Sequence, residues 1–378
     1  MKIMIVTGGY LPARKYGGPV ASLVNFVEQL GEFYDIDIVS TNHDLGDTTP
    51  FPNIKPGFNP LGKAQVLYIS DKEKNYLFFK SLIKERKPDC LYLSSIFDFK
   101  LNFPLLLLAK QTGIKVVYAP RGELSDKVLK IKALKKHIFL FAMRVSGLYK
   151  SIYFQATSDR EKKDTARRLK VPEKMIFSVA NVPTSPAFKN EILKTPGSLR
   201  IVFISRIHRS KNLIYALECV NRLSGDITFD IYGHIEHSDY WQDCLKLMAI
   251  APYNVKINYL GEIEMGKSKS VFLKYDCFLF PTLSENYSQA IAESVLSGTI
   301  PVISRGTTPW DDIDLNGGFA IPLDSPSEFV KTLQALCNME NEEYKNLYDL
   351  LLKYRKTKLD TTSLCEKYHK MFNEVIGR

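Results

Sequence analysis

Two glutamates, Glu285 and Glu293, stand eight residues apart in a segment that predicts a strand, a turn and then a helix. The apolar run at residues 277–280 predicts a buried strand that Pro281 ends, and a helical pattern begins near Tyr287. Glu285 therefore falls in a turn at the carboxyl end of a strand, and Glu293 falls inside the helix. Free backbone N–H groups and the helix dipole favour an anionic ligand at such a turn.

The two carboxylates are too far apart to act as a pair on one bond. Eight residues of ideal helix rise about 12 Å, whereas the paired carboxylates of glycosidases lie about 5 to 9.5 Å apart. Because carboxylates accept hydrogen bonds from vicinal hydroxyls, the two glutamates can instead hold separate parts of one long ligand. A nucleotide sugar fits, with its phosphates at the helix start and its diols on the acids. The alternative is an ordinary amphipathic helix with two solvated glutamates.

Arg206 and Lys211 follow another predicted buried strand, at residues 199–204. Two cations at a strand end and a helix start neutralise the charge that builds on a departing nucleotide diphosphate. Without other motifs in the chain, the same two residues would be part of a solvated turn.

A strand at residues 2–7, a glycine-rich loop and a helical pattern at residues 20–30 open the chain, as in a doubly wound domain. The loop contains Gly17 and Gly18, and its spacing is neither G-x-G-x-x-G nor the Walker pattern. A dinucleotide or nucleoside triphosphate cradle is therefore not expected there. A plain tight turn is the alternative to a ligand-binding loop.

Ser284-Glu285-Asn286-Tyr287, Glu293, the Ser297-Gly298 helix end and the strand at residues 300–303 together resemble the signature of glycosyltransferase family 4. The family usually has Phe-Gly where this chain has Tyr287-Ser288. Other segments resembling the family follow in the family's order along nearly the whole chain. They are Gly17-Gly18 in a Pro-x(4)-Gly-Gly loop, the Pro-Arg-Gly-Glu-Leu segment with Arg121, the exit at residues 181–183, and Arg206 with Lys211.

The resemblance implies an α/β protein of GT-B fold, with two Rossmann-like, doubly wound domains facing a central cleft. Residues 1–183 are expected to form the acceptor-side domain and residues 184–350 the nucleotide-sugar domain. Residues 351–378 are expected to form a C-terminal helix that returns to the first domain. The implied reaction moves a sugar, with retention, from a UDP or GDP sugar to a glycan or polyprenyl-linked acceptor of surface polysaccharide synthesis, with no cofactor and no metal required.

The resemblance also assigns roles to individual residues. Glu285 is expected to hold the sugar hydroxyls, Glu293 the ribose, and Arg206 with Lys211 the diphosphate. The complete donor-binding set is Gly17, Gly18, Arg206, Lys211, Glu285, Asn286, Tyr287, Ser288 and Glu293. Arg121 stands where the family has a histidine and joins Glu285, Arg206 and Lys211 as a catalytic candidate. Arginine is no base at neutral pH, but its planar fork suits a phosphate or carboxylate, and a structural arginine at a strand end is the alternative.

Composition limits the class of protein. A chain of 378 residues with 45% hydrophobic content is long enough for two α/β domains. The six cysteines are widely spaced without a C-x-x-C pair, which suits a reducing cytoplasm and indicates neither a zinc site nor a disulfide framework. The net charge of +10 favours an anionic partner, and nucleic acid is not expected because zinc-finger, RNP and basic-zipper patterns are missing.

The stretch that begins at Lys127 and ends at Lys150 has seven basic residues, no acidic ones, and interleaved Val, Leu, Ile and Phe. Such a basic amphipathic stretch is typical of segments that lie on anionic membranes. The alternative is a solvated helix whose apolar stripe faces the core. Because the apolar runs of the chain are too short to span a bilayer, a cytoplasmic protein is expected, soluble or peripheral on the inner face of the membrane.

Two other functions stay open at this point. A nucleotide-sugar epimerase or hydrolase can use the same fold and the same donor site. A non-catalytic basic module that binds membrane or nucleic acid would explain the charge, but it would not need the two glutamates.

Overall fold

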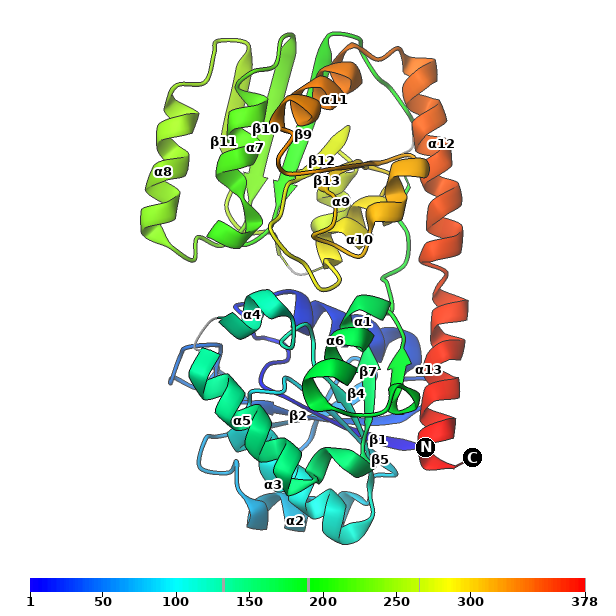
Figure 1. Cartoon of the computed structure of the whole chain (residues 1–378). Helices are drawn as coiled ribbons and strands as arrows, with labels where there is room; N and C mark the ends of the chain where they lie inside the picture. The colour runs from blue at the N-terminus through cyan, green and yellow to red at the C-terminus, as the bar shows by residue number, and fades with distance from the viewer. Residues whose placement is uncertain (131–132, 189–190, 265, 378) are drawn as a thin grey trace. The chain divides into compact units, whose positions relative to one another are not determined.

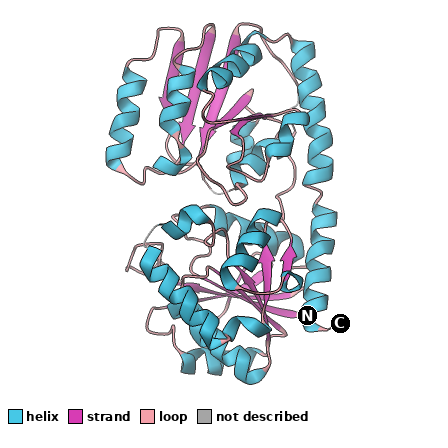
Figure 2. Ribbon diagram, in the orientation of Figure 1, coloured by secondary structure: helices cyan, strands magenta, loops and turns pink. Residues whose placement is uncertain are grey.

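The computed structural model describes residues 1–130, 133–188, 191–264 and 266–377 (Figure 1). The chain divides into two units, each built on its own β-sheet with helices packed around it (Figure 2). Unit 1 comprises Met1–Val182 together with Thr361–Arg378, and unit 2 comprises Pro183–Asp360. The expected α/β class with two doubly wound domains is confirmed.

Unit 1 is built on an eight-stranded sheet with the order β3-β4-β2-β1-β5-β6-β7-β8. Every paired strand is parallel except β3, which runs antiparallel to β4 at the sheet edge. The strands are β1 (Lys2–Thr7), β2 (Asp35–Thr41), β3 (Asn59–Leu61), β4 (Ala64–Ile69), β5 (Cys90–Ser94), β6 (Lys115–Ala119), β7 (Tyr153–Ala156) and β8 (Ile176–Ser178).

Helices cover both faces of this sheet. Since successive side chains of a strand point to opposite faces, alternate strand residues lie in different cores. Met4 and Val6 of β1 belong to a core that α2, α3 and α5 complete, whereas Ile3 and Ile5 belong to a core completed by α1 and α13. The helices of unit 1 are α1 (Gly18–Leu30), α2 (Tyr76–Arg86), α3 (Phe99–Thr112), α4 (Asp126–Lys130), α5 (Ala133–Ser146), α6 (Asp159–Leu169) and α13 (Thr361–Ile376), with short 3₁₀ turns η1 (Leu148–Ser151) and η2 (Glu173–Met175).

Unit 2 has a six-stranded, wholly parallel sheet with the order β11-β10-β9-β12-β13-β14. From β9 the chain winds outward through β10 to β11, and from β12 it winds outward in the opposite direction. The switch point of the sheet therefore lies between β9 and β12. The strands are β9 (Ser198–Ile204), β10 (Asp226–Tyr232), β11 (Val255–Tyr259), β12 (Cys277–Phe280), β13 (Ile300–Ser304) and β14 (Phe319–Ile321).

The helices of unit 2 follow its strands in the order of a doubly wound domain. They are α7 (Leu213–Val220), α8 (Ser238–Ala249), α9 (Ser268–Phe272), α10 (Gln289–Leu296), α11 (Pro326–Asn338) and α12 (Asn341–Lys358), with 3₁₀ turns η3 (Arg209–Lys211) and η4 (Asp311–Leu315).

The chain returns to unit 1 later than the expected residue 351. Helix α12 continues to Lys358, and its Leu351, Tyr354 and Arg355 are buried. The Arg355 guanidinium donates to the backbone oxygens of Ala187 and Leu296, which fastens the end of this helix within unit 2. The return therefore falls at Thr361, where α13 begins and packs its Tyr368, Met371 and Phe372 into the unit 1 core.

The basic stretch from Lys127 to Lys150 forms α4, α5 and η1 rather than one helix, and its residues 131 and 132 lie outside the described part of the chain. Leu129, Leu140 and Met143 of this stretch are buried in the core that also holds α2 and α3. Among the described residues no helix combines the length and apolarity needed to cross a membrane.

Candidate active site

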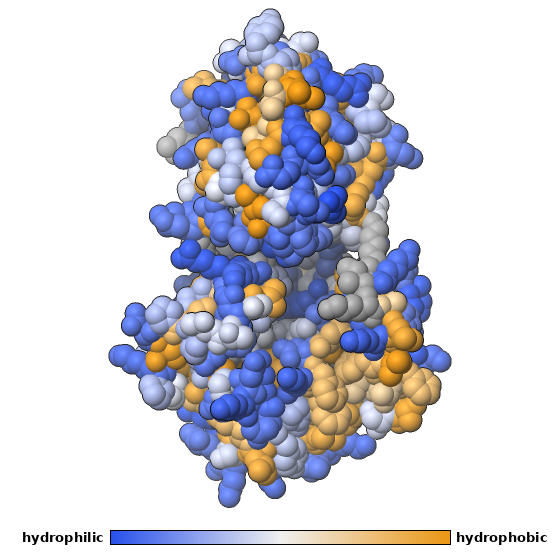
Figure 3. Space-filling model, turned by 90° about the vertical axis from the view of Figure 1, so that its left-hand side faces the viewer, coloured by the Kyte–Doolittle hydropathy of each residue, from blue (hydrophilic) through white to orange (hydrophobic). Residues whose placement is uncertain are grey.

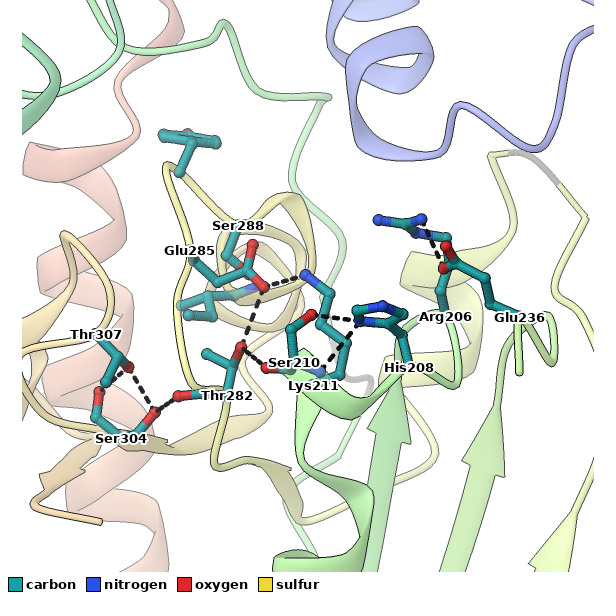
Figure 4. A network of polar contacts seen from close by, with 12 residues as sticks. Arg206, His208, Ser210, Lys211, Glu236, Thr282, Glu285, Ser288, Ser304 and Thr307 are labelled. Atoms are coloured by element: carbon teal, nitrogen blue, oxygen red, sulfur yellow. Dashed lines mark hydrogen bonds and ion pairs between the residues drawn. The ribbon is translucent and has the colours of Figure 1, made fainter. Parts of the chain in front are cut away.

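The residues at the switch point of unit 2 come from the loops that follow β9, β12 and β13. These strands are neighbours in one parallel sheet, so the loops after them meet at its carboxyl edge. In open α/β sheets, ligands bind at this position beside the switch point. Figure 4 shows the side chains of this group and the contacts between them.

Lys211 and Glu285 form the centre of the group. The Lys211 ammonium donates to Glu285 Oε1 in an ion pair, and each side chain is only 13% exposed. Lys211 ends the 3₁₀ turn η3 after β9, and Glu285 lies in the loop between β12 and α10. The structure thus brings together one cation and one carboxylate that are 74 residues apart in the sequence.

Hydrogen bonds join the loop after β9 to the loop after β12. The backbone oxygen of Ser210 accepts from the Leu283 N–H at 2.8 Å and from the Thr282 hydroxyl at 3.0 Å. The Asn212 side chain donates to the Pro281 oxygen at 3.0 Å. Because these bonds fix both loops, the Lys211 and Glu285 side chains extend from a rigid base.

The loop after β13 holds Glu285 from the other side. The Glu285 N–H donates to the Thr307 oxygen at 2.8 Å, and Ser304 Oγ donates to the Thr282 oxygen at 2.5 Å. The indole N–H of Trp310 donates to the Tyr287 oxygen, and the two rings lie 5.5 Å apart. Ser210, Thr282, Ser304 and Thr307 were not among the predicted donor-site residues, since hydroxyl residues in loops carry no signal until the sheet order is known.

Ser288 stands at a position where the family usually has glycine. It is the N-cap of α10, with φ 67°, and its hydroxyl accepts from the Ile291 N–H at 3.4 Å. This left-handed backbone region favours glycine, which is the residue that the family usually has at this position. Serine therefore adopts strained backbone here and supplies a helix cap in return. Asn286 and Tyr287 precede it, half-buried and buried respectively.

Glu293 lies on α10 and faces different partners from Glu285. Its carboxylate accepts from Gln289 Nε2 at 3.3 Å and is also hydrogen-bonded by Ser268, from α9. Burial raises the pKa of Glu293 above its usual value, although these hydrogen bonds act in the opposite direction. Glu285, in the loop before α10, and Glu293, on α10 itself, thus have different hydrogen-bonding partners.

Arg206 is not part of the Lys211–Glu285 group. Its guanidinium pairs with Glu236, from the loop after β10, at 2.8 Å, and its side chain is 44% exposed. Figure 4 shows this pair on the far side of His208 from Lys211. His208 Nδ1 lies 2.8 Å from Ser210 Oγ, and burial lowers the pKa of this histidine.

Gly17, Gly18 and Arg121 belong to unit 1. Gly17 has φ 62° and is the N-cap of α1, where the left-handed backbone requires glycine. A Cβ on Gly18 would meet nothing within 4 Å, so the start of α1 is open on that side. This loop is also fixed by Asp44, which accepts from the Arg14 N–H at 2.8 Å.

Arg121 is held inside unit 1 by polar neighbours. Its guanidinium donates to Asn181 Oδ1 at 2.6 Å and to the Tyr92 hydroxyl at 3.0 Å. The Tyr92 hydroxyl in turn donates to Gln155 at 2.9 Å. These contacts join β5, β6, β7 and the segment after β8, which favours the structural alternative for this arginine.

We expect Arg121→Met to destabilise unit 1 rather than to slow the reaction. The guanidinium donates two hydrogen bonds, and hydrogen bonds to a charged group are each worth about 1.5–3 kcal/mol, so the free energy of unfolding should fall by about 3 kcal/mol or more. Chemical denaturation measures this loss, and turnover by the folded fraction should stay close to that of the wild type. Unchanged stability together with a raised KM would instead assign Arg121 to ligand binding.

Comparisons with known proteins agree with this architecture. The fold matches a crystal structure of Anabaena Alr3699/HepE in complex with UDP and glucose, with TM-score 0.73 and 12% identity over 99% of this chain and 100% of that one. It also matches sucrose-phosphate synthase from Thermosynechococcus elongatus, with TM-score 0.73 and 12% identity over 100% and 99% of the two chains. An α,α-trehalose-phosphate synthase (UDP-forming) from Burkholderia xenovorans, in complex with glucose-6-phosphate, matches with TM-score 0.70 and 11% identity over 99% and 100%.

These structures are GT-B glycosyltransferases, so the predicted GT-B fold is confirmed. No curated protein matches the sequence of this chain. Residues 185–349, which include Arg206, Lys211, Glu285 and Glu293, match the family model of glycosyl transferases group 1. The chain therefore has a GT-B fold, and its second unit is similar to glycosyl transferases group 1 over residues 185–349.

Proposed function

We propose that this protein is a retaining glycosyltransferase that moves a sugar from a nucleotide diphosphate sugar to a glycan or lipid-linked acceptor of surface polysaccharide synthesis. The observation that carries the proposal is the Lys211–Glu285 pair at the switch point of unit 2. A cation for the diphosphate and a carboxylate for the sugar hydroxyls lie side by side, and the N-terminus of α10 follows them in the chain. Uridine diphosphate is the proposed nucleotide, because the similar Anabaena protein binds UDP-glucose.

The donor would separate Lys211 from Glu285 when it binds. Phosphate oxygens accept hydrogen bonds from the ammonium, while the sugar hydroxyls donate to the carboxylate. Each side chain then exchanges one partner for another, so neither charge is left buried alone. Glu293 is assigned to the ribose, whose vicinal hydroxyls match a carboxylate acceptor.

In the reaction, the bond between the anomeric carbon and the diphosphate oxygen breaks, and both electrons leave with the nucleotide diphosphate. Lys211 stabilises the negative charge that develops on this leaving group, and Arg206 adds to it after leaving Glu236. The acceptor hydroxyl oxygen forms the new bond on the same face of the sugar, and its proton passes to the departing diphosphate oxygen on that face. Glu285 keeps the sugar oriented while the two bonds exchange.

A product assay separates this proposal from the other activities open to the same site. The full chain is incubated with UDP-glucose, with and without glycan acceptors, and free UDP, free sugar and altered sugar are measured. We expect UDP to be released only when an acceptor is present, together with formation of an α-linked glycan. Hydrolysis alone, or conversion of the sugar to its epimer without transfer, would contradict the proposal.

We further propose that α5 places the enzyme on an anionic membrane, where a lipid-linked acceptor would be found. Four apolar side chains of α5, spaced four, three and four residues apart, are 60–74% exposed and form one stripe along the helix: Leu134, Ile138, Phe141 and Val145. Exposed Lys130 and Lys135 lie in the same segment. Figure 3 shows apolar surface on unit 1, from the side on which α5 lies in Figure 1.

Both kinds of side chain contribute to this attachment. A basic residue near an anionic surface adds about 1 kcal/mol at most, and full burial of a large apolar side chain adds about 1.5–3 kcal/mol. Partial insertion of the stripe together with two lysines therefore gives a few kcal/mol. This is enough for reversible binding and too little for permanent anchoring.

Ile138→Glu combined with Phe141→Glu should abolish co-sedimentation with vesicles that contain anionic lipid. Lys130→Glu with Lys135→Glu should weaken it, and high salt should reduce the wild-type binding in part, because salt screens only the electrostatic contribution. Leu77→Glu is the matched control, since Leu77 is equally exposed on α2 of the same unit. Equal sedimentation of the wild type and the α5 variants would remove the membrane from the proposal.

A further inference from the structure

Three potential metal-binding side chains meet beside the proposed donor site. His208 comes from the loop after β9, and Glu236 and His237 come from the loop after β10. One ligand atom from each residue lies within 4.8 Å of the other two. The rings of His208 and His237 have their centroids 5.0 Å apart. The Lys211–Glu285 pair includes none of these three residues.

The backbone fixes the two loops in register beyond the ends of their strands. Ile207 and Ile235 form a parallel bridge, in which the Ile207 N–H donates to the His234 oxygen at 2.7 Å and the Glu236 N–H donates to the Ile207 oxygen at 3.2 Å. This bridge sets His208 on one loop opposite Glu236 and His237 on the other. The three side chains are therefore positioned by sheet-like hydrogen bonds.

The chemistry of the three ligands selects the class of metal. Two imidazoles and one carboxylate are the ligands of zinc and related first-row transition ions, whereas magnesium and calcium prefer oxygen ligands. Ligands bonded to zinc at about 2.0–2.1 Å lie about 3.4 Å from one another in a tetrahedron. Starting from at most 4.8 Å, rotation of the exposed Glu236 and His237 side chains can close the site.

Ser210 is placed to orient His208 as a ligand. Its hydroxyl lies 2.8 Å from His208 Nδ1, and its N–H donates to the same nitrogen at 3.1 Å. Because Nδ1 accepts from the Ser210 N–H, Nε2 carries the ring proton in this tautomer and must lose it to bind a metal. Metal binding at Nε2 would favour the other tautomer, in which Nδ1–H donates to Ser210 Oγ, the outer hydrogen bond that metal-bound histidines usually make, and the Ser210 N–H gives up its bond to Nδ1.

We infer that His208, Glu236 and His237 form a binding site for a divalent transition ion of the zinc class, next to the donor loop. A metal at this site would take Glu236 away from Arg206, which now pairs with it at 2.8 Å. Three protein ligands leave a fourth tetrahedral position for water or another oxygen ligand. The site is independent of the assignment of Lys211 and Glu285 to the donor.

Calorimetric titration of the chelator-treated full chain with Zn²⁺, without nucleotide and without a polyhistidine tag, tests this inference. We expect one binding event that Mg²⁺ does not reproduce. His208→Gln and His237→Gln should each weaken it about tenfold or more, and Ser210→Ala should weaken it about tenfold. His234→Gln is the matched control, because His234 lies in the same loop and its ring contacts Glu262 instead, at 2.9 Å.

The outcomes that would overturn the inference are specific. Zn²⁺ affinity that is unchanged in both His208→Gln and His237→Gln would place any bound ion elsewhere. An equal loss in His234→Gln would mean non-specific binding to surface histidines. Circular dichroism of each variant confirms that a loss of affinity does not come from unfolding.

Discussion

Lys211→Ala is expected to lower the turnover number about 10²-fold or more and to leave unit 2 folded. Removing one preorganised donor to a developing negative charge costs about 10²–10³ in rate. Lys211 meets that description, because its ammonium is largely shielded from water, paired with Glu285 and fixed by the loop contacts of Ser210. Steady-state kinetics with saturating donor measures the effect.

Lys246→Ala is the matched control for this variant. Lys246 is a 76% exposed lysine of the same unit, paired with Asp243 on α8, and its loss should leave the rate unchanged. A folded Lys211→Ala enzyme with turnover close to that of the wild type would show that the diphosphate lies elsewhere. Arg206→Ala should have a smaller effect than Lys211→Ala, because Arg206 is half-exposed and must first leave Glu236.

Replacing the two glutamates should separate sugar chemistry from nucleotide binding. Glu285→Ala is expected to lower turnover about 10²-fold, the scale for losing an interaction that orients the reacting group, while the Kd for free UDP stays nearly constant. Glu293→Ala is expected to weaken UDP binding about 10- to 100-fold, since a hydrogen bond to a charged group is worth about 1.5–3 kcal/mol. Calorimetry with UDP and kinetics with UDP-glucose measure the two effects.

An equal loss of UDP affinity in both variants would contradict this division of roles. Gln289→Ala is a useful companion to Glu293→Ala, because it removes only the 3.3 Å hydrogen bond to that carboxylate. It should weaken UDP binding much less than Glu293→Ala does.

The raised pKa of Glu293 gives the nucleotide affinity a defined pH dependence. Only the ionised carboxylate accepts hydrogen bonds from both ribose hydroxyls, and burial raises the pKa of Glu293 above the usual range for glutamate. UDP affinity should therefore fall as the pH decreases through this raised pKa. In Glu293→Gln this fall should disappear, while the affinity stays low at every pH.

Much of the fold could be predicted because it depends on local patterns. Short apolar runs that alternate with helical segments predicted α/β structure, and the resemblance to family 4 implied two doubly wound domains. The expected end of a strand at Pro281 is also correct, since β12 ends at Phe280. The direct contact of Lys211 with Glu285 could not be predicted, because it requires β12 to lie next to β9. Chain order says nothing about that adjacency, since β10 and β11 come between the two strands.

Details that depend on tertiary packing could not be predicted from the sequence either. The exit of the chain from unit 2 was expected ten residues too early, because the burial of Leu351, Tyr354 and Arg355 is decided by the surface on which α12 packs. Arg121 matched a family position, but its partners Asn181 and Tyr92 come from other segments of unit 1. The sequence does not show that His208 and His237 lie close together, because the bridge between their two loops is a tertiary contact.

Binding of nucleotide diphosphates to the wild type and to Lys211→Ala tests the central claim most directly. In a thermal and calorimetric panel of UDP, GDP, ADP and their sugars, one nucleotide at 100 times its Kd should stabilise the wild-type chain by about 2.7 kcal/mol. The account predicts UDP as that nucleotide, with an affinity at least about tenfold lower in Lys211→Ala. Stabilisation by none of these ligands, or equal affinity in the two proteins, would contradict a donor site built on Lys211 and Glu285.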